Sequence, residues 1–125
     1  MRILVVDDLR TFPRLGAEYA RTSAEALVVL DQLVGSEAVL DELWLDHDLG
    51  TGADGALDDI GPVVDWLCER AFFGEAPRIG VVVVHTSNPV GARMIDAALQ
   101  RWYPVRRVDA LDAGATVAPR DERGE

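Results

Sequence analysis

The sequence predicts an α/β fold built on a parallel sheet, and three observations carry this prediction. Short runs rich in β-branched residues alternate with segments that have apolar residues at helical spacing, a pattern typical of right-handed crossovers between parallel strands. The run Ile79–Val84 is apolar nearly throughout, as in a strand buried on both faces at the centre of such a sheet. With 125 residues, of which 49% are hydrophobic and 27% charged, the chain suits one domain around one core.

Five segments have the pattern of strands. Ile3–Val6 is short, β-branched and followed at once by two acids, and Val39–Leu45 also leads into acidic residues. The full set of predicted strands is Ile3–Val6, Ala17–Arg21, Val39–Leu45, Ile79–Val84 and Val105–Val108. The segment from Leu49 to Gly55 is rich in glycine, and we expect a loop there.

A capping box predicts where the first helix begins. Thr22 stands three residues before Glu25, so each side chain can satisfy a backbone N–H at the helix start. The helix is expected to end near Gly35, a residue type common just past helix ends. Its predicted inner face consists of Leu27, Leu30 and Val34.

Two further helices follow from apolar spacing. The second has apolar residues at i, i+3, i+4, i+7 and i+8, namely Ile60, Val63, Val64, Leu67 and Cys68. The third begins at Asn88, a good N-cap residue, followed by Pro89 in the first turn. Its predicted apolar stripe consists of Gly91, Met94, Ala98, Leu99 and Trp102. The three tryptophans are expected to serve packing.

Composition excludes several classes of protein. The formal net charge is −10, and all 12 basic residues are arginines, so duplex nucleic acid is not an expected partner. No apolar run approaches the ~20 residues of a membrane span, and the N-terminus lacks a signal-peptide pattern, so we expect a cytoplasmic protein. Cys68 is the only cysteine, which rules out an internal disulfide. We expect one domain over residues 1–112 and a frayed, small and polar tail over residues 113–125.

Polar residues follow three of the predicted strands directly. They are Asp7 and Asp8 after the first strand, residues 46–48 (Asp-His-Asp) after the third, and residues 85–88 (His-Thr-Ser-Asn) after the fourth. In a parallel sheet the carboxyl ends of the strands meet at one edge, where ligands bind. The sequence therefore predicts a functional site at this edge.

Four of these residues are acids that would repel one another without a cation. They are Asp7, Asp8, Asp46 and Asp48. A hard divalent ion with oxygen ligands, Mg²⁺ or Mn²⁺, resolves that repulsion, so we expect a metal site. The alternative is that the acids cluster at strand ends because those ends are solvated.

His47 and His85 are the only histidines of the chain, and both fall at the predicted site. Either could act as a general acid or base near neutral pH. The alternative for each is a hydrogen bond that anchors a loop.

The start of the third helix favours an anion. Backbone N–H groups at a helix N-terminus attract negative charge, and the hydroxyls of Thr86 and Ser87 could bind the same phosphate as Asn88. Arg93, one turn into the helix, and Arg10, just after the first acid pair, are further candidate phosphate ligands. The alternatives are an ordinary N-cap at Asn88 and solvent-facing arginines.

Three motifs in order resemble a known family. They are Asp7-Asp8-Leu9-Arg10, Leu45-Asp46-His47-Asp48-Leu49-Gly50, and His85-Thr86-Ser87-Asn88-Pro89 with Gly91 and Met94 shortly after. Over roughly residues 1–100 the chain resembles the cyclic-phosphate processing receiver-like domains, an offshoot of the response-regulator receivers. The resemblance implies a three-layer, doubly wound, five-stranded parallel sheet of order 2-1-3-4-5, as in receiver and flavodoxin-like folds. It also implies Mg²⁺ held by the acid pair and Asp46, with Asp48 contributing a further ligand.

One departure from ordinary receivers concerns the phosphoryl contact. Receivers carry a lysine at the end of the fifth strand, and this chain has no lysine. The two histidines point instead to an enzyme that hydrolyses a cyclic phosphate ester, with Asp46, His47 and His85 as candidate catalytic residues. In this hypothesis His85 or His47 protonates the leaving alcohol, or Asp46 acts as the nucleophile.

Two other functions stay open. One is a signalling receiver that is phosphorylated on Asp46. The other is a module that binds a cyclic nucleotide or phosphate without cleaving it. In each case the expected partner is a small phosphorylated or cyclic-phosphate ligand, and the domain could also form a homodimer.

Overall fold

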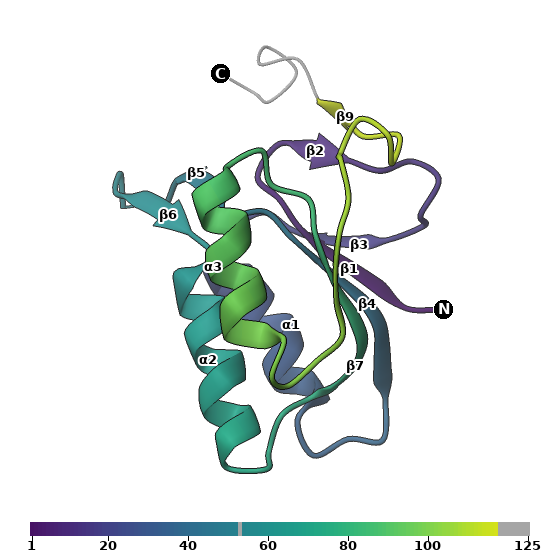
Figure 1. The fold of residues 1–125 in the computed structure, drawn as a ribbon, viewed down its shortest axis with the longest axis vertical. Coiled ribbons are helices and arrows are strands. Elements are labelled where there is room, and N and C mark those ends of the chain that lie inside the picture. The colour runs from purple at the N-terminus through teal and green to yellow at the C-terminus, as the bar shows by residue number, and fades with distance from the viewer. Residues whose placement is uncertain (53, 118–125) are drawn as a thin grey trace.

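The predicted parallel sheet forms the centre of the molecule (Figure 1). The structure is a computed structural model that describes residues 1–52 and 54–117. All neighbouring strands in the sheet are parallel. In spatial order they are β3 (Glu18–Ala20), β1 (Ile3–Val6), β4 (Val39–Leu45), β7 (Arg78–Val84) and β8 (Val105–Arg107). Counted along the chain, this is the order 2-1-3-4-5, so the receiver-type sheet is confirmed.

The three predicted helices are also present. They are α1 (Ser23–Leu33), α2 (Gly61–Phe72) and α3 (Pro89–Leu99). The predicted N-caps are confirmed, because Glu25 N donates to Thr22 Oγ1 over 3.1 Å and Gly91 N donates to Asn88 Oδ1 over 2.9 Å. Among the described residues, no helix combines the length and the apolar character needed to cross a bilayer.

The inner faces of two helices differ from the prediction. On α1 the stripe is shifted, so that Leu30 is buried as expected while Leu27 and Val34 are only partly buried. On α3 Met94 is 42% exposed, and Trp102 lies beyond the helix end. The apolar side chains buried in their place are Ala26, Leu33, Ala92 and Ile95. These helices carry several apolar residues per turn, so the sequence is compatible with more than one inner face. Packing against the sheet determines which of these faces is buried. On α2 Val63, Val64 and Leu67 are buried as predicted.

All three helices cover the same face of the sheet, which we call the helix face. Leu30, Leu67 and Ile95, one from each helix, belong to one buried cluster with strand residues such as Leu43 and Val82. This follows from topology, because β3 to β4, β4 to β7 and β7 to β8 all step across the sheet in the same direction. Right-handed crossovers then place every helix on the same side.

The opposite face, which we call the loop face, is covered by chain segments without helices in the described part of the chain. Its cluster joins Ile3, Val5, Trp44 and Val83 of the strands to Phe12 and to residues of the segment 108–115. A second helical layer, which the receiver resemblance implies, is therefore replaced here by loops. The chain passes from β1 to the edge strand β3 through residues 7–17 without forming a helix.

Two small antiparallel sheets complete the fold. β5 (Asp48–Thr51) pairs with β6 (Leu57–Asp59), which corrects the prediction of a loop from residue 49 to 55. Gly50 and Gly55 adopt positive φ angles that allow this hairpin to bend and turn. β2 (Arg10–Thr11) pairs with β9 (Thr116–Val117), inside the segment predicted as a frayed tail. Residues 118–125 of that segment lie outside the described residues.

Candidate functional site

Strand register places three of the predicted site residues in one row. Val6, Leu45 and Val84 are paired neighbours on β1, β4 and β7, and the next residues along the chain are Asp7, Asp46 and His85. Side chains alternate along a strand, so these three lie on the same side of the sheet as the residues two positions before them. Those residues belong to the loop-face cluster, and the row therefore lies on the loop face as well. The three residues are 0%, 6% and 2% exposed, and one ligand atom of each lies within 4.8 Å of the others.

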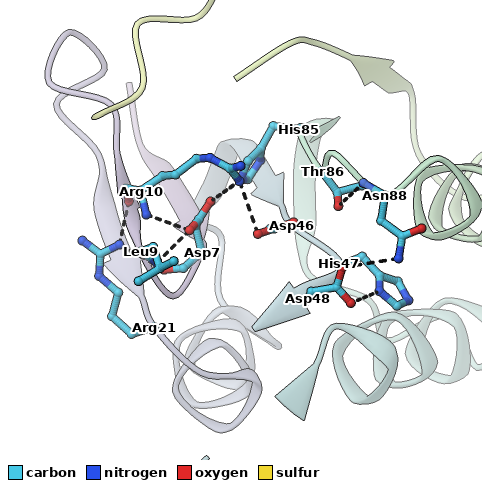
Figure 2. A network of polar contacts seen from close by, with 10 residues as sticks. All are labelled: Asp7, Leu9, Arg10, Arg21, Asp46, His47, Asp48, His85, Thr86 and Asn88. Atoms are coloured by element: carbon cyan, nitrogen blue, oxygen red, sulfur yellow. Dashed lines mark hydrogen bonds and ion pairs between the residues drawn. The ribbon is translucent and has the colours of Figure 1, made fainter. Parts of the chain in front are cut away.

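Asp7 is held as an ionised carboxylate. Its Oδ1 accepts hydrogen bonds from the backbone N–H groups of Leu9 (2.9 Å) and Arg10 (2.8 Å), while its Oδ2 lies 2.9 Å from His85 Nε2 (Figure 2). Burial by itself raises the pKa of Asp7, but the hydrogen bonds from His85 and from the two backbone amides outweigh it and lower the pKa to about 2. The negative charge of Asp7 is thus a built-in property of the loop that follows β1.

His85 is enclosed between Asp7 and two aromatic rings. The ring of Phe12 meets it edge-on at 5.2 Å, and that of Trp44 lies 5.9 Å away. Nε2 faces Asp7, whereas Nδ1 is buried and has no hydrogen-bond partner among residues 1–52 and 54–117.

Asp46 follows β4 and is buried beside Asp7. Burial raises the pKa of Asp46, a hydrogen bond from Thr86 lowers it, and the negative charge of Asp7 raises it further, so that the net shift is upward. Arg10 Nη1 stands 3.5 Å from Asp46 Oδ2 and 3.5 Å from Asp7 Oδ2. The two carboxylates therefore share one guanidinium group.

Arg21 shapes the acidic loop and was not predicted from the sequence. Its Nη1 donates to the backbone carbonyls of Asp7 (3.0 Å) and Arg10 (2.6 Å), and its guanidinium lies 4.6 Å from the centre of the Tyr19 ring. The residue stands at the end of a predicted strand, where nothing in the local sequence distinguishes it from a solvent-facing arginine.

A second polar group lies on the other side of the sheet edge. His47 Nδ1 is 3.0 Å from Asp48 Oδ1, and Asn88 Nδ2 donates to Asp48 Oδ2 over 3.3 Å (Figure 2). The His47 ring packs against α3 at Gly91, where an added Cβ would lie only 2.5 Å from the ring carbon Cγ. Gly91 is thus required for the close approach of His47 to the helix. Asp48 therefore lies with His47 and not with the buried Asp46.

A cavity of about 300 Å³ opens beside the buried row. The predicted residues that line it are Asp7, Asp8, Arg10, Asp46, Asp48 and Ser87. Gly50 lies directly under Asp8, with the position of its missing Cβ 2.6 Å from Asp8 Oδ2. Thr86 and Asn88 stand at the edge of the same region, since Thr86 donates a hydrogen bond to Asp46 and Asn88 Nδ2 donates to Asp48 Oδ2 over 3.3 Å. Arg93 is exposed on α3 and is not among the described residues that line the cavity.

The comparison with protein families agrees with this arrangement. Residues 2–101 match the model of the cyclic-phosphate processing receiver domain. The chain belongs to this family. Neither the search of curated proteins nor that of solved structures found a significant match.

In this receiver domain the buried row could hold a metal ion. Two carboxylates and an imidazole whose ligand atoms lie within 4.8 Å of one another form a donor set suited to a divalent cation. The composition of the cluster differs from the predicted metal set, because His85 joins Asp7 and Asp46. The side chain of Asp48 is instead 67% exposed and bonded to His47 and Asn88.

Proposed function

We propose that this receiver domain hydrolyses a cyclic phosphate ester in a metal-dependent reaction at the row of Asp7, Asp46 and His85. The observation that carries the proposal is this buried, preassembled row beside an open cavity, in a domain of the cyclic-phosphate processing family. A bound Mg²⁺ or Mn²⁺ would neutralise phosphate charge and polarise the phosphorus–oxygen bonds. Asp7 and Asp46 would hold it, with His85 beside them.

The chain's own residues can orient the phosphate. A cyclic phosphodiester carries one negative charge, and the acidic cavity offers Arg10 and Ser87 as cationic and hydroxyl ligands. The N-terminus of α3, capped by Asn88, lies at the same sheet edge and favours an anion. These groups would place the phosphorus atom between the carboxylate row and the helix.

The reaction needs one proton at the leaving oxygen. The attacking water loses a proton as its oxygen bonds to phosphorus, one ring P–O bond breaks, and the released alkoxide takes up a proton to give a phosphate monoester. The side chain of His47 is 18% exposed whereas that of His85 is fully buried, so His47 is the better placed to supply this proton. His85 then serves to hold Asp7 in position.

Phosphorus NMR tests the proposal directly. The purified chain is incubated with Mg²⁺ or Mn²⁺ and a mixture of 2′,3′- and 3′,5′-cyclic nucleotides, with EDTA as the control. We expect one ester to become a monoester, with EDTA abolishing the reaction and Asp46→Asn reducing it by about 100-fold or more. Esters that stay unchanged for a day with both metals would contradict the proposal for these substrates.

Variants of the two histidines separate their roles. His47→Gln should lower turnover by about 100-fold while Mn²⁺ binding is retained, because His47 lies outside the buried row. His85→Gln should weaken Mn²⁺ binding as well, because it removes the partner of Asp7 Oδ2. Equal Mn²⁺ affinity in both variants would show that His85 does not support the metal site.

One observation favours a second function, that of a phosphoacceptor. Asp46 ends the strand that receivers use for phosphorylation, and it accepts a hydrogen bond from Thr86. If Asp46 is phosphorylated, acetyl phosphate with Mg²⁺ will increase the intact mass by one phosphoryl group, and Asp46→Asn will abolish the gain. A cyclic ester converted with no such mass gain would favour hydrolysis without this intermediate.

A further inference from the structure

Arg10 occupies the position that a cation would take between the two buried carboxylates. Its Nη1 lies 3.5 Å from Asp7 Oδ2 and 3.5 Å from Asp46 Oδ2, so a single nitrogen is shared by both acids. Its side chain is 26% exposed, which leaves it a path to solvent. Figure 2 shows the contacts from this guanidinium to both carboxylates.

The charges make this contact a competitor for a metal. Two carboxylates attract one guanidinium, and a divalent ion placed at the same oxygens would stand within a few ångströms of that positive charge. Like charges at such distances in a partly buried site repel appreciably. A metal at Asp7 and Asp46 therefore requires the guanidinium to move away.

The backbone of Arg10 is fixed, so the movement is confined to the side chain. Its N–H donates to Asp7 Oδ1 over 2.8 Å, its carbonyl accepts from Arg21 over 2.6 Å, and it pairs with Val117 across β2 and β9. Thr11 and Thr116 strengthen the same pairing with a hydroxyl–hydroxyl contact of 2.8 Å.

A second cavity gives the side chain a place to go. It measures about 270 Å³ and is lined by Arg10, His85, Ser87 and Asp109, together with residues of the C-terminal segment. Arg10, Ser87 and Val117 line both this cavity and the one beside the acids. The side chain of Arg10 thus stands on the border between two open spaces.

We propose that Arg10 is the resident counter-ion of the acid row, that a divalent metal displaces it, and that the released guanidinium then binds the phosphate of the ligand. The proposal rests on the proposed function in taking the ligand to be a phosphate ester. It assigns one residue two successive partners, and it makes phosphate binding dependent on prior metal binding.

Mn²⁺ binding without any substrate tests the first step. Mn²⁺ affinity is measured by electron paramagnetic resonance for the wild-type chain, for Arg10→Gln and for Arg14→Gln. Arg14 is an exposed arginine of the same segment, so it controls for the loss of one positive charge. We expect Arg10→Gln to bind Mn²⁺ about tenfold more tightly, and Arg14→Gln to stay within about twofold of the wild type. An unchanged or weaker affinity in Arg10→Gln, or no binding in any of the three, would overturn the proposal.

Inorganic phosphate tests the second step. Its binding is measured by calorimetry, with and without saturating Mn²⁺. We expect phosphate binding in the wild type to need Mn²⁺, and Arg10→Gln to weaken it by about tenfold while Arg14→Gln does not. Phosphate that binds equally well without Mn²⁺, or equally well to Arg10→Gln, would show that the guanidinium is not handed over.

Two controls keep the outcome interpretable. Arg10→Gln retains the backbone contacts of the loop, and circular dichroism with thermal unfolding checks that the fold is unchanged. Arg10→Lys retains the charge on a different head group, so its Mn²⁺ affinity should stay closer to that of the wild type than that of Arg10→Gln. Opposite shifts of Mn²⁺ and phosphate affinity in Arg10→Gln would stand even if no cyclic ester is hydrolysed, so this inference and the proposed function fail separately.

Discussion

The two faces of the sheet are stabilised in different ways. The helix face is covered by three helices and filled mainly with leucine, valine and isoleucine from these helices and from the strands of the central sheet. The loop face is covered by irregular segments around a few large rings, with Phe12 and Trp44 at a centroid distance of 4.9 Å. Directed hydrogen bonds support this smaller cluster, among them the Tyr19 hydroxyl that accepts from Phe12 N over 2.7 Å.

The buried polar row belongs to the loop face, and this has a physical reason. The N–H groups inside a helix are already bonded to carbonyls of the same helix. A loop has N–H groups to spare, and two of them, from Leu9 and Arg10, hold the carboxylate of Asp7. In this domain both layers therefore stabilise the fold, while the loop layer also supplies backbone donors that help to keep a buried acid ionised.

A pair of core truncations tests whether the two faces differ in their effect on the site. Phe12→Ala on the loop face and Leu67→Ala on the helix face should each lower the free energy of unfolding by about 3–4 kcal/mol, since both side chains are fully buried. Only Phe12→Ala should also weaken Mn²⁺ binding, because its ring packs on His85. Urea unfolding and Mn²⁺ titration check the two effects. Equal Mn²⁺ affinities in the two variants would mean that the faces are not distinct in function.

Gly91→Ala tests the contact between α3, on the helix face, and the His47 ring. The new methyl group would overlap the His47 ring, and we expect a loss of about 1–3 kcal/mol in the free energy of unfolding. In a His47→Ala background the same change should instead stabilise by about 0.5–1 kcal/mol, because alanine favours the helix over glycine. Urea unfolding of the four proteins measures this. A loss of the same size in both backgrounds would show that the ring is not the cause.

Alkaline titration gives an effect on stability that is confined to high pH. Burial, followed by the negative charge of the nearby Cys68 thiolate, raises the pKa of Tyr103 to about 12 from its ordinary value of 10.0. Its hydroxyl donates to Pro77 O over 3.0 Å. The folded state therefore keeps a proton that the unfolded chain loses, so stability is complete below pH 10 and falls by about 2 kcal/mol as the pH rises to 12. The chain has no lysine to titrate in this range.

Tyr103→Phe provides the control for that titration. It removes the titrating hydroxyl, so unfolding curves at pH 9 and above should lose this part of the pH dependence. Tyr103 belongs to the helix-face cluster. Phe12→Ala should therefore leave the alkaline loss intact if the two faces act independently.

The parts of the fold that follow from local pattern were predictable. Ile3–Val6 and the start of α1 at Thr22 are fixed by β-branched runs and by short-range capping, and both appear as expected. The position of the buried row could also be predicted, because acids and a histidine that directly follow parallel strands meet at one edge of the sheet. The family resemblance is confirmed over residues 2–101.

The parts that depend on contacts distant in sequence were not predictable. β2 and β9 have only two residues each, which is too short for a periodic pattern to reveal a strand. They pair although more than a hundred residues separate them in the sequence. Arg21 acts on two backbone carbonyls of a loop whose path the sequence does not specify. In the described chain no helix forms between β1 and β3. One layer of the fold therefore consists of loops where the receiver resemblance implied helices.

The register of the central strands has a consequence for how the acid row can vary. Neighbouring strands lie about 4.8 Å apart, on the order of twice the bond length from a small divalent ion to oxygen. Side chains that leave adjacent strands at the same level thus stand at a spacing set by the backbone and not by any loop. The strand spacing of the sheet therefore fixes the distance between these three backbone positions. The distance between the ligand atoms can change only through the length of the side chains at Asp7, Asp46 and His85.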